Sequence, residues 1–179
     1  MEQRYTPKAQ NKNAVYLSAA LFLVGCGLLA AGMAGAPAAA VYQLGFALLS
    51  AIAMLVWLRY CMSSYTYTVT DAYDVPMLIV TETRGRRIST ACRVELGHVE
   101  RIISVPDGQS AEGRAALAEY RSAPERYSYL STLFPRSSVI LYAHEGGRRF
   151  ALRMEPCDAF FASLSERVFR AGGGKGEEE

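Results

Sequence analysis

Two long stretches of hydrophobic residues, separated by a short turn, dominate the first third of the chain. The first runs from Ala14 to about Met33 and the second from about Ala38 to Tyr60. No Asp, Glu, Lys or Arg occurs from Ala14 to Leu58, and this length is too great for one membrane span of about 20 residues but suits two. Because the backbone must satisfy its own hydrogen bonds in lipid, each stretch is predicted to be a transmembrane helix.

The connection between the two stretches is short and favours a hairpin of adjacent, antiparallel helices. It runs from Gly32 to Pro37 and is rich in residues that break helices. A cleaved signal peptide is the alternative for the first stretch, since Ala34-Gly35-Ala36 offers small residues of the kind that a signal peptidase accepts. The stretch is longer than the roughly 7–15 apolar residues of a signal peptide, and a second one follows at once, which favours the hairpin.

Beyond Cys61 the pattern changes from helical to alternating, which is typical of half-buried strands. Turn residues such as Gly85, Pro106-Asp107-Gly108 and Gly146-Gly147 separate the alternating segments. The predicted strands cover residues 65–70, 77–83, 88–96, 98–105, 127–133, 138–144 and 150–154. A polar insert at about 107–124, rich in Ala, Glu and Arg, is predicted to be a mobile loop or a short surface helix.

The end of the chain returns to a helical pattern. Pro156 suits the first turn of a helix. One apolar stripe with helical spacing consists of Phe160, Phe161, Leu164 and Val168. The helix is expected to end near Arg170, and the glycine-rich and acidic tail, residues 172–179, is expected to be disordered.

These patterns predict a two-helix transmembrane hairpin followed by a mainly β domain. We expect an N-terminal segment at 1–13, the hairpin at 14–60 with helices at about 14–33 and 38–60, the β domain at 61–171 and the tail at 172–179. Seven strands followed by one amphipathic helix suit a small antiparallel barrel or sandwich that the helix closes.

The order of elements in the β domain resembles the pleckstrin-homology (PH) fold. Three segments carry the resemblance: Tyr67-Thr68-Val69-Thr70-Asp71, residues 94–102, and Leu152-Arg153-Met154-Glu155-Pro156 with the two phenylalanines that follow. The resemblance covers residues 60–170. Two spans followed directly by such a domain resemble bacterial membrane proteins with PH-like domains, a family of unknown function.

This resemblance implies a seven-stranded antiparallel barrel with a C-terminal helix. The insert at about 107–124 departs from a compact version of that fold and leaves the pairing of the fourth and fifth strands open. Members that bind phosphoinositides carry basic residues in the loop between the first two strands. That loop reads Asp71-Ala72-Tyr73-Asp74 here and is acidic, so the resemblance does not imply phosphoinositide binding.

The charges that flank the two spans predict that both ends of the chain are cytoplasmic, in a cell (inner or plasma) membrane. Arg4, Lys8 and Lys12 precede the first span, whereas the turn between the spans carries no charge. Arg59 ends the second span, and further arginines follow. Positive residues stay on the cytoplasmic side, so the turn is expected to lie outside. Trp57 suits the aromatic belt at the inner interface.

Small residues within the spans suggest a helix–helix contact. The candidates are Gly27, Ala31 and Gly35 on the first helix and Gln43, Ala47 and Ala51 on the second. Small residues let helix backbones approach closely, and Gln43 could bond to the other helix or to a second copy. Glycine and alanine are also common in membrane spans generally, so both interpretations stay open. The absence of ionisable residues between Ala14 and Leu58 favours an anchor over an ion pathway.

The sequence offers little that suggests an enzyme. Four cysteines lie at isolated positions, and His98 and His144 lack partners at metal-ligand spacing in the sequence. No G-x-S-x-G motif occurs, and the glycines around Lys175 lack the spacing of a phosphate-binding loop. We therefore expect no catalytic residues, no cofactor and no metal.

One set of residues suggests anion binding. Arginines surround two predicted turns, at Arg84, Arg86 and Arg87 and at Arg148 and Arg149. From Arg59 onward the chain carries 16 basic and 16 acidic residues, so solvated turns are the alternative and nucleic-acid binding is not expected. The expected function is a membrane-anchored, non-enzymatic interaction module that binds a protein partner or a second copy. The alternative is a sensor of anionic lipid headgroups or a small ligand.

Overall fold

The structure is a computed structural model that describes residues 3–7, 12–34, 38–72, 75–105, 110–135 and 137–173. The chain forms two compact units. One is a helical hairpin, Ala9–Ser63, with which the short segment Thr132–Phe134 is grouped. The other is a β-rich domain made of Met1–Lys8, Ser64–Ser131 and Pro135–Glu179.

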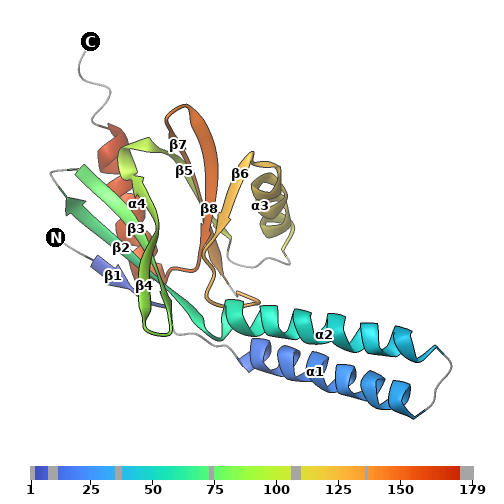
Figure 1. Cartoon of the computed structure of the whole chain (residues 1–179). Coiled ribbons are helices and arrows are strands. Elements are labelled where there is room, and N and C mark those ends of the chain that lie inside the picture. The colour runs from blue at the N-terminus through green and yellow to red at the C-terminus, as the bar shows by residue number, and fades with distance from the viewer. Residues whose placement is uncertain are drawn as a thin grey trace. The chain divides into compact units, whose positions relative to one another are not determined.

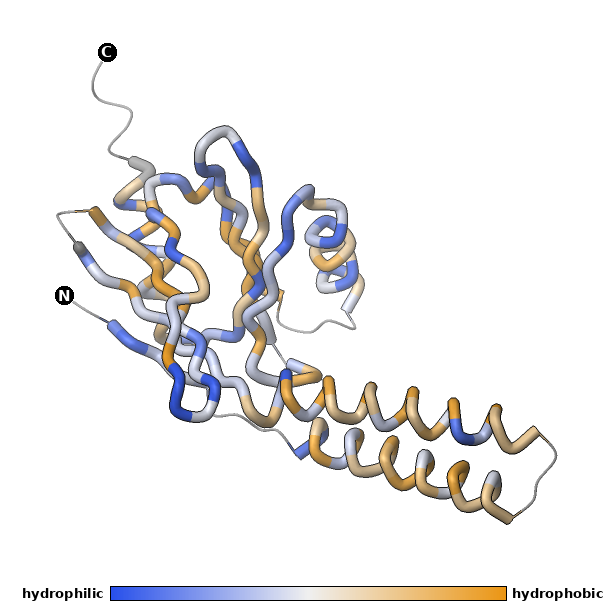
Figure 2. The backbone as a smooth tube through the Cα atoms, viewed as in Figure 1, coloured by the Kyte–Doolittle hydropathy of each residue, from blue (hydrophilic) through white to orange (hydrophobic). Residues whose placement is uncertain are grey.

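The hairpin consists of α1 (Lys12–Met33) and α2 (Ala39–Tyr60), which pack against each other (Figure 1). Both predicted helices are confirmed. Each is long and apolar enough to cross a membrane, and few of their residues are buried within the structure. Hydrophobic residues follow both helices along most of their length (Figure 2). A helix pair that exposes this much apolar surface suits lipid better than water. The chain therefore fits a two-span membrane protein.

The first sheet of the β domain has four strands in the order β1-β2-β3-β4. They are β1 (Gln3–Tyr5), β2 (Ser63–Ala72), β3 (Val75–Arg84) and β4 (Arg87–Glu95). A two-residue turn joins β3 to β4, and Gly85 in that turn has a φ of 57°, which favours glycine. The three strands predicted between residues 65 and 96 are confirmed, whereas the sequence does not predict β1.

The second sheet has the order β5-β7-β8-β6. Its strands are β5 (Val99–Val105), β6 (Glu125–Ser128), β7 (Ser138–Glu145) and β8 (Arg148–Met154). The short helix η1 (Leu96–His98) leads from β4 into β5. β5 and β8 each pair antiparallel with β7, but β6 runs parallel to β8. The predicted fourth and fifth strands therefore do not pair, because they lie at opposite edges of this sheet.

The described residues form two sheets of four strands each, so a seven-stranded antiparallel barrel is not confirmed. The main core contains side chains of both sheets and of the terminal helix α4 (Asp158–Gly173). Phe160 and Leu164 of α4 are fully buried in this core, and Phe161 and Val168 pack against it. The predicted terminal helix and its apolar stripe are thus confirmed.

Tyr67 of β2 forms hydrogen bonds with two other segments of the β domain. Its hydroxyl donates a 2.6 Å hydrogen bond to the carbonyl oxygen of Tyr129 and accepts one of 3.1 Å from the backbone N–H of Glu155. Its ring is fully buried, and burial raises the pKa of the hydroxyl far above its usual range. Tyr67 thereby fixes both the segment after β6 and the segment that enters α4.

The insert between β5 and β6 contains the helix α3 (Ala111–Ser122), which is one of the two forms predicted for it. The Ser110 side chain caps this helix by accepting a 2.9 Å hydrogen bond from the backbone N–H of Gly113. Its apolar side chains join a second, smaller core formed with β5, β7 and β8, and that core includes Val105 and Ile140. The insert therefore covers one face of the second sheet.

The unpredicted strand β1 belongs to the β domain although it precedes the hairpin in sequence. It pairs antiparallel with β2, so that Tyr5 lies opposite Tyr67. The hydroxyls of Thr6 and Thr66 lie 2.9 Å apart, within hydrogen-bonding distance. The chain thus leaves the domain after β1 and returns to it at the start of β2, at the same end of the first sheet.

Candidate functional site

The open seam of the two sheets contains a groove, which we call the β4–β6 groove. β4 is the last strand of the first sheet, and β6 is the last strand of the second. The groove has a volume of about 400 Å³. Its walls include Ala91 and Cys92 of β4, Tyr127 of β6, Tyr129 and Phe150. Within the described residues no further strand pairs with the outer side of β4 or β6, so the seam stays open.

Aromatic side chains contribute to the lining of the β4–β6 groove. The rings of Tyr127 and Phe150 meet edge to face with centroids 6.3 Å apart. The hydroxyl of Tyr129 donates a 3.4 Å hydrogen bond to the carbonyl oxygen of Ala91 in β4. Burial raises the pKa of the Cys92 thiol, which therefore stays protonated at neutral pH. The groove is thus a mainly apolar surface without an activated nucleophile.

The rim of this groove carries balanced charges. Arg93 and Arg148 provide two positive charges, and Glu125 and Glu145 provide two negative ones. Arg148 and Glu125 form an ion pair of 3.9 Å. The charged residues that line the groove therefore carry no net charge.

A second groove of about 400 Å³ lies between α3 and the second sheet. Arg101 forms an ion pair with Glu119 of α3, and its guanidinium lies 5.0 Å from the centre of the Tyr142 ring. The Tyr142 hydroxyl oxygen is buried and has no hydrogen-bond partner among the described residues. Arg149 and Glu100 form an ion pair of 3.2 Å at the other side of this groove. Its charges are therefore already matched within the protein.

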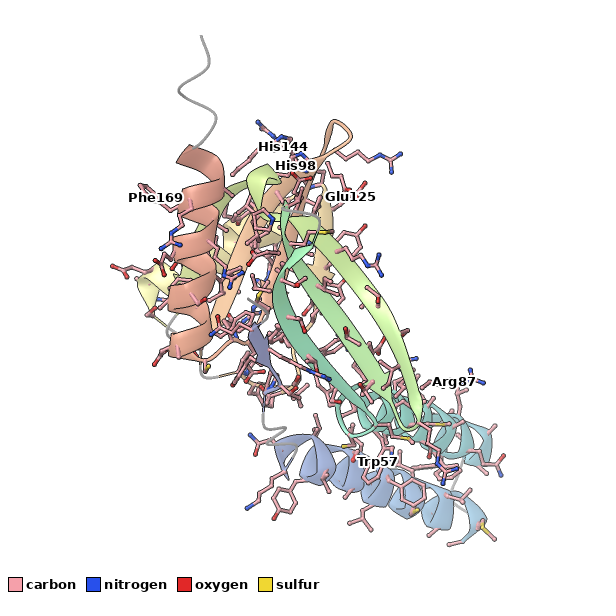
Figure 3. The ribbon with its side chains drawn as sticks, turned by 90° about the vertical axis from the view of Figure 1, so that its left-hand side faces the viewer. Trp57, Arg87, His98, Glu125, His144 and Phe169 are labelled. Carbon is pink, nitrogen blue, oxygen red and sulfur yellow. The ribbon has the colours of Figure 1, made fainter. Side chains whose placement is uncertain are left out.

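The structure separates the two predicted arginine turns. Arg87 and His144, which stand next to the two turns, lie at opposite ends of the β domain (Figure 3). Arg84, Arg86 and Arg87 surround the β3–β4 turn, whereas Arg148 and Arg149 begin β8. The five arginines thus do not form one site.

Acidic neighbours differ between the two turns. Arg148 faces Glu125, and Arg149 faces Glu100, so the β7–β8 turn is neutralised by carboxylates of other strands. At the β3–β4 turn Arg84 pairs with Glu82 at 3.0 Å, and three arginines share that neighbourhood. The β3–β4 turn is therefore the more strongly basic of the two.

His98 and His144 are brought together by the fold, although they are far apart in sequence. Their ring centroids are 5.5 Å apart (Figure 3). Glu95 lies 3.8 Å from Nδ1 of His98, and Glu100 lies 3.6 Å from Nδ1 of His144. No group of three or more potential ligands able to hold a metal occurs in the part of the chain that the structure describes. The sequence misses this pair because only the β5–β7 register, which sets Val99 opposite Ala143, places the rings together.

Two small residues that the sequence does not single out lie at the contact between the two helices. Gly25 and Gly32 of α1 are buried, and a Cβ at Gly32 would lie 3.1 Å from Cβ of Tyr42. Gly27, Gln43, Ala47 and Ala51 are exposed, Ala31 is half-buried, and Gly35 lies outside the described residues. The contacts of the four exposed residues stay a prediction, and for Gln43 this includes a bond to a second copy.

Gly32→Leu is expected to separate the two helices, and Gly27→Leu is the matched control. A side chain at position 32 meets α2, so overpacking should cost about 1–3 kcal/mol. A Cβ at Gly27 meets nothing within 4 Å, so the same change there should be nearly neutral. Thermal unfolding in detergent micelles, followed by the fluorescence of Trp57, measures both variants. Equal melting temperatures would contradict the observed packing.

Comparisons with models of protein families, with curated protein sequences and with solved structures found no match to this chain.

Proposed function

We propose that this protein is a membrane-anchored, non-enzymatic interaction module whose β domain binds a protein partner at the cytoplasmic face of a cell membrane. The observation that carries the proposal is the β4–β6 groove, an apolar hollow between two edge strands in a domain tethered by a membrane hairpin. Edge strands and aromatic pockets are surfaces on which proteins commonly bind extended peptides.

The anchor follows from the two apolar helices and from the pairing of β1 with β2. Because β1 precedes α1 and β2 follows α2, two strands of one sheet flank the hairpin. Crossing the membrane twice returns the chain to the side on which it started, which this pairing requires. The basic residues Lys8, Lys12 and Arg59 flank the helices and favour the cytoplasmic side.

The partner that suits the groove is an extended segment with large apolar side chains and little net charge. Tyr127 and Tyr129 offer aromatic contact area, which often dominates binding energy at interfaces, and the buried Phe150 supports the Tyr127 ring. Two arginines and two glutamates on the rim cancel, so a strongly acidic or basic segment gains nothing there.

The proposal includes a PH-like origin for the β domain. Seven of its strands and α4 follow one another in the order that the resemblance implies. The additional strand β1, the helix α3 and the parallel strand β6 depart from the compact fold. The partner surface lies next to one of these departures, since β6 forms one wall of the groove.

Photo-cross-linking from the groove tests the proposal in the full-length protein within its native membrane. A photoreactive phenylalanine analogue replaces Tyr127 in the groove, and in the control it replaces Glu112, which is exposed on α3. We expect one protein to cross-link from position 127 alone, through a single linear segment. A synthetic peptide of that segment should slow hydrogen exchange of the β4 and β6 amides.

Two matched variants then test whether the Tyr127 side chain contributes to binding of the peptide. Tyr127→Ala should weaken binding of that peptide about tenfold, whereas Phe169→Ala removes an exposed aromatic ring elsewhere and should leave it unchanged. Equal cross-linking from positions 127 and 112, or a peptide that binds both variants alike, would refute the groove as the partner site.

A further inference from the structure

The end of the first sheet at which the hairpin is attached carries a basic, partly apolar tip. We call residues 84–88 the β3–β4 tip. It contains Arg84, Arg86 and Arg87, and Ile88 follows with 72% of its surface exposed. We propose that this tip docks on the anionic lipid headgroups of the leaflet in which the hairpin is anchored, an inference that rests on the anchor in the proposed function.

Strand directions place the tip at the end of the first sheet where β1 ends and β2 begins. The hydroxyl of Tyr65, near the start of β2, donates a 3.3 Å hydrogen bond to Glu82, which lies two residues before the tip. β1 runs antiparallel to β2 and ends at Tyr5, opposite Tyr67. The end of β1, the start of β2 and the tip therefore share one end of the first sheet.

Chain length then limits how far this end can lie from the membrane. α2 ends at Tyr60 and β2 begins at Ser63. Three residues span at most roughly 10 Å, whatever angle the domain adopts. A helix that crosses the bilayer therefore holds the start of β2, and with it the tip, close to the headgroups.

The charges near this end have one predominant sign. From Thr83 to Thr90 the chain contains three arginines and no acidic residue. Lys12 begins α1 and Arg59 lies in the last turn of α2, so both add positive charge at the helix ends that lead to the β domain. Glu82 is an acidic residue that the structure pairs with the tip, through Arg84. The opposite end, at the β7–β8 turn, has its arginines matched by carboxylates and lacks this excess.

Arginine and isoleucine suit this role through different interactions. Guanidinium groups bind phosphate oxygens in a bidentate manner, and each basic residue close to an anionic leaflet strengthens attachment about fivefold. The Ile88 side chain exposes apolar surface that can enter the boundary between headgroups and acyl chains. Docking would fix the orientation of the β4–β6 groove relative to the membrane, because β4 begins in the tip and forms one wall of the groove.

The test uses the full chain, purified and reconstituted into vesicles. An environment-sensitive fluorescent amino acid replaces Ile88 in one variant and Phe169 in the control. Phe169 is also exposed, and it lies far from Arg87 in the β domain (Figure 3). Vesicles contain phosphatidylcholine alone or with phosphatidylglycerol, and nitroxide-labelled lipid in the same vesicles reports proximity by quenching.

We expect a blue shift and strong quenching at position 88 in vesicles with phosphatidylglycerol, and neither at position 169. Arg84→Gln, Arg86→Gln and Arg87→Gln together should lower the equilibrium constant for docking roughly a hundredfold, and high salt should act in the same direction. Equal emission at position 88 in both vesicle types, or full docking by the triple variant, would overturn the proposal.

Two further outcomes separate the sources of the effect. A blue shift produced by soluble inorganic phosphate in pure phosphatidylcholine vesicles would assign the tip to free anions and overturn docking on lipid. Failure of the chain to float with phosphatidylcholine vesicles would refute the anchor itself, and with it this inference. If the chain floats normally but shows no blue shift or quenching at position 88, the docking of the tip is refuted and the proposed function still stands.

Discussion

Phe160→Ala is expected to lower the free energy of unfolding of the β domain by about 3–5 kcal/mol, because it leaves a large cavity in the main core. The ring is 1% exposed and contacts two other rings. The centroids of Tyr5 and Tyr67 lie 6.0 and 6.2 Å from its own. The loss therefore affects α4, β1 and β2 together. Urea unfolding in detergent micelles, followed by the near-ultraviolet circular dichroism of the tyrosines, measures it.

Phe169→Ala is the matched control on the same helix. Phe169 is 82% exposed and points away from the core in Figure 3, so its removal should change stability by no more than about 0.5 kcal/mol. A similar loss in both variants would mean that α4 is not packed on the sheets through the face that contains Phe160 and Leu164. A loss confined to Phe160→Ala supports the observed orientation of the helix.

Local patterns in the sequence were sufficient to predict most helices and strands of this fold. A charge-free stretch from Ala14 to Leu58 defines the helices, and alternation defines the strands, because both depend on neighbours a few residues apart. The strand β1 cannot be found in this way. Its three residues are too short for a periodic signal, and they become a strand only through pairing with β2, which follows the whole hairpin.

Strand pairing and the positions of the grooves cannot be predicted from local patterns in the sequence. The segment 125–128 has no local property that distinguishes a parallel partner of β8 from an antiparallel partner of β5. The β4–β6 groove exists because these two strands end up at neighbouring sheet edges, so its residues share no motif. The arginines of the β3–β4 tip were visible in the sequence, but their separation from Arg148 and Arg149 depends on the fold.

Replacing residues 9–62 by a linker of about four glycine and serine residues should convert the chain into a soluble, folded β domain. The end of β1 and the start of β2 lie side by side, as the contact between Thr6 and Thr66 shows. A linker of the length found in β-hairpins, about 2–5 residues, therefore spans the gap without strain. All membrane association through the apolar helices should be lost, which flotation with phosphatidylcholine vesicles measures.

A shorter variant that begins at Ser63, and therefore lacks β1, tests whether β1 is part of the folded domain. It lacks Tyr5, whose ring stacks on Tyr67 at 6.4 Å, and it exposes the outer edge of β2. Its stability should be lower than that of the linked variant by about 1–2 kcal/mol, since one large, half-buried side chain no longer packs on the core. Equal urea midpoints for the two variants would show that β1 contributes nothing to the domain. The pairing of β1 with β2 would then no longer support placing both ends of the hairpin on one side of the membrane.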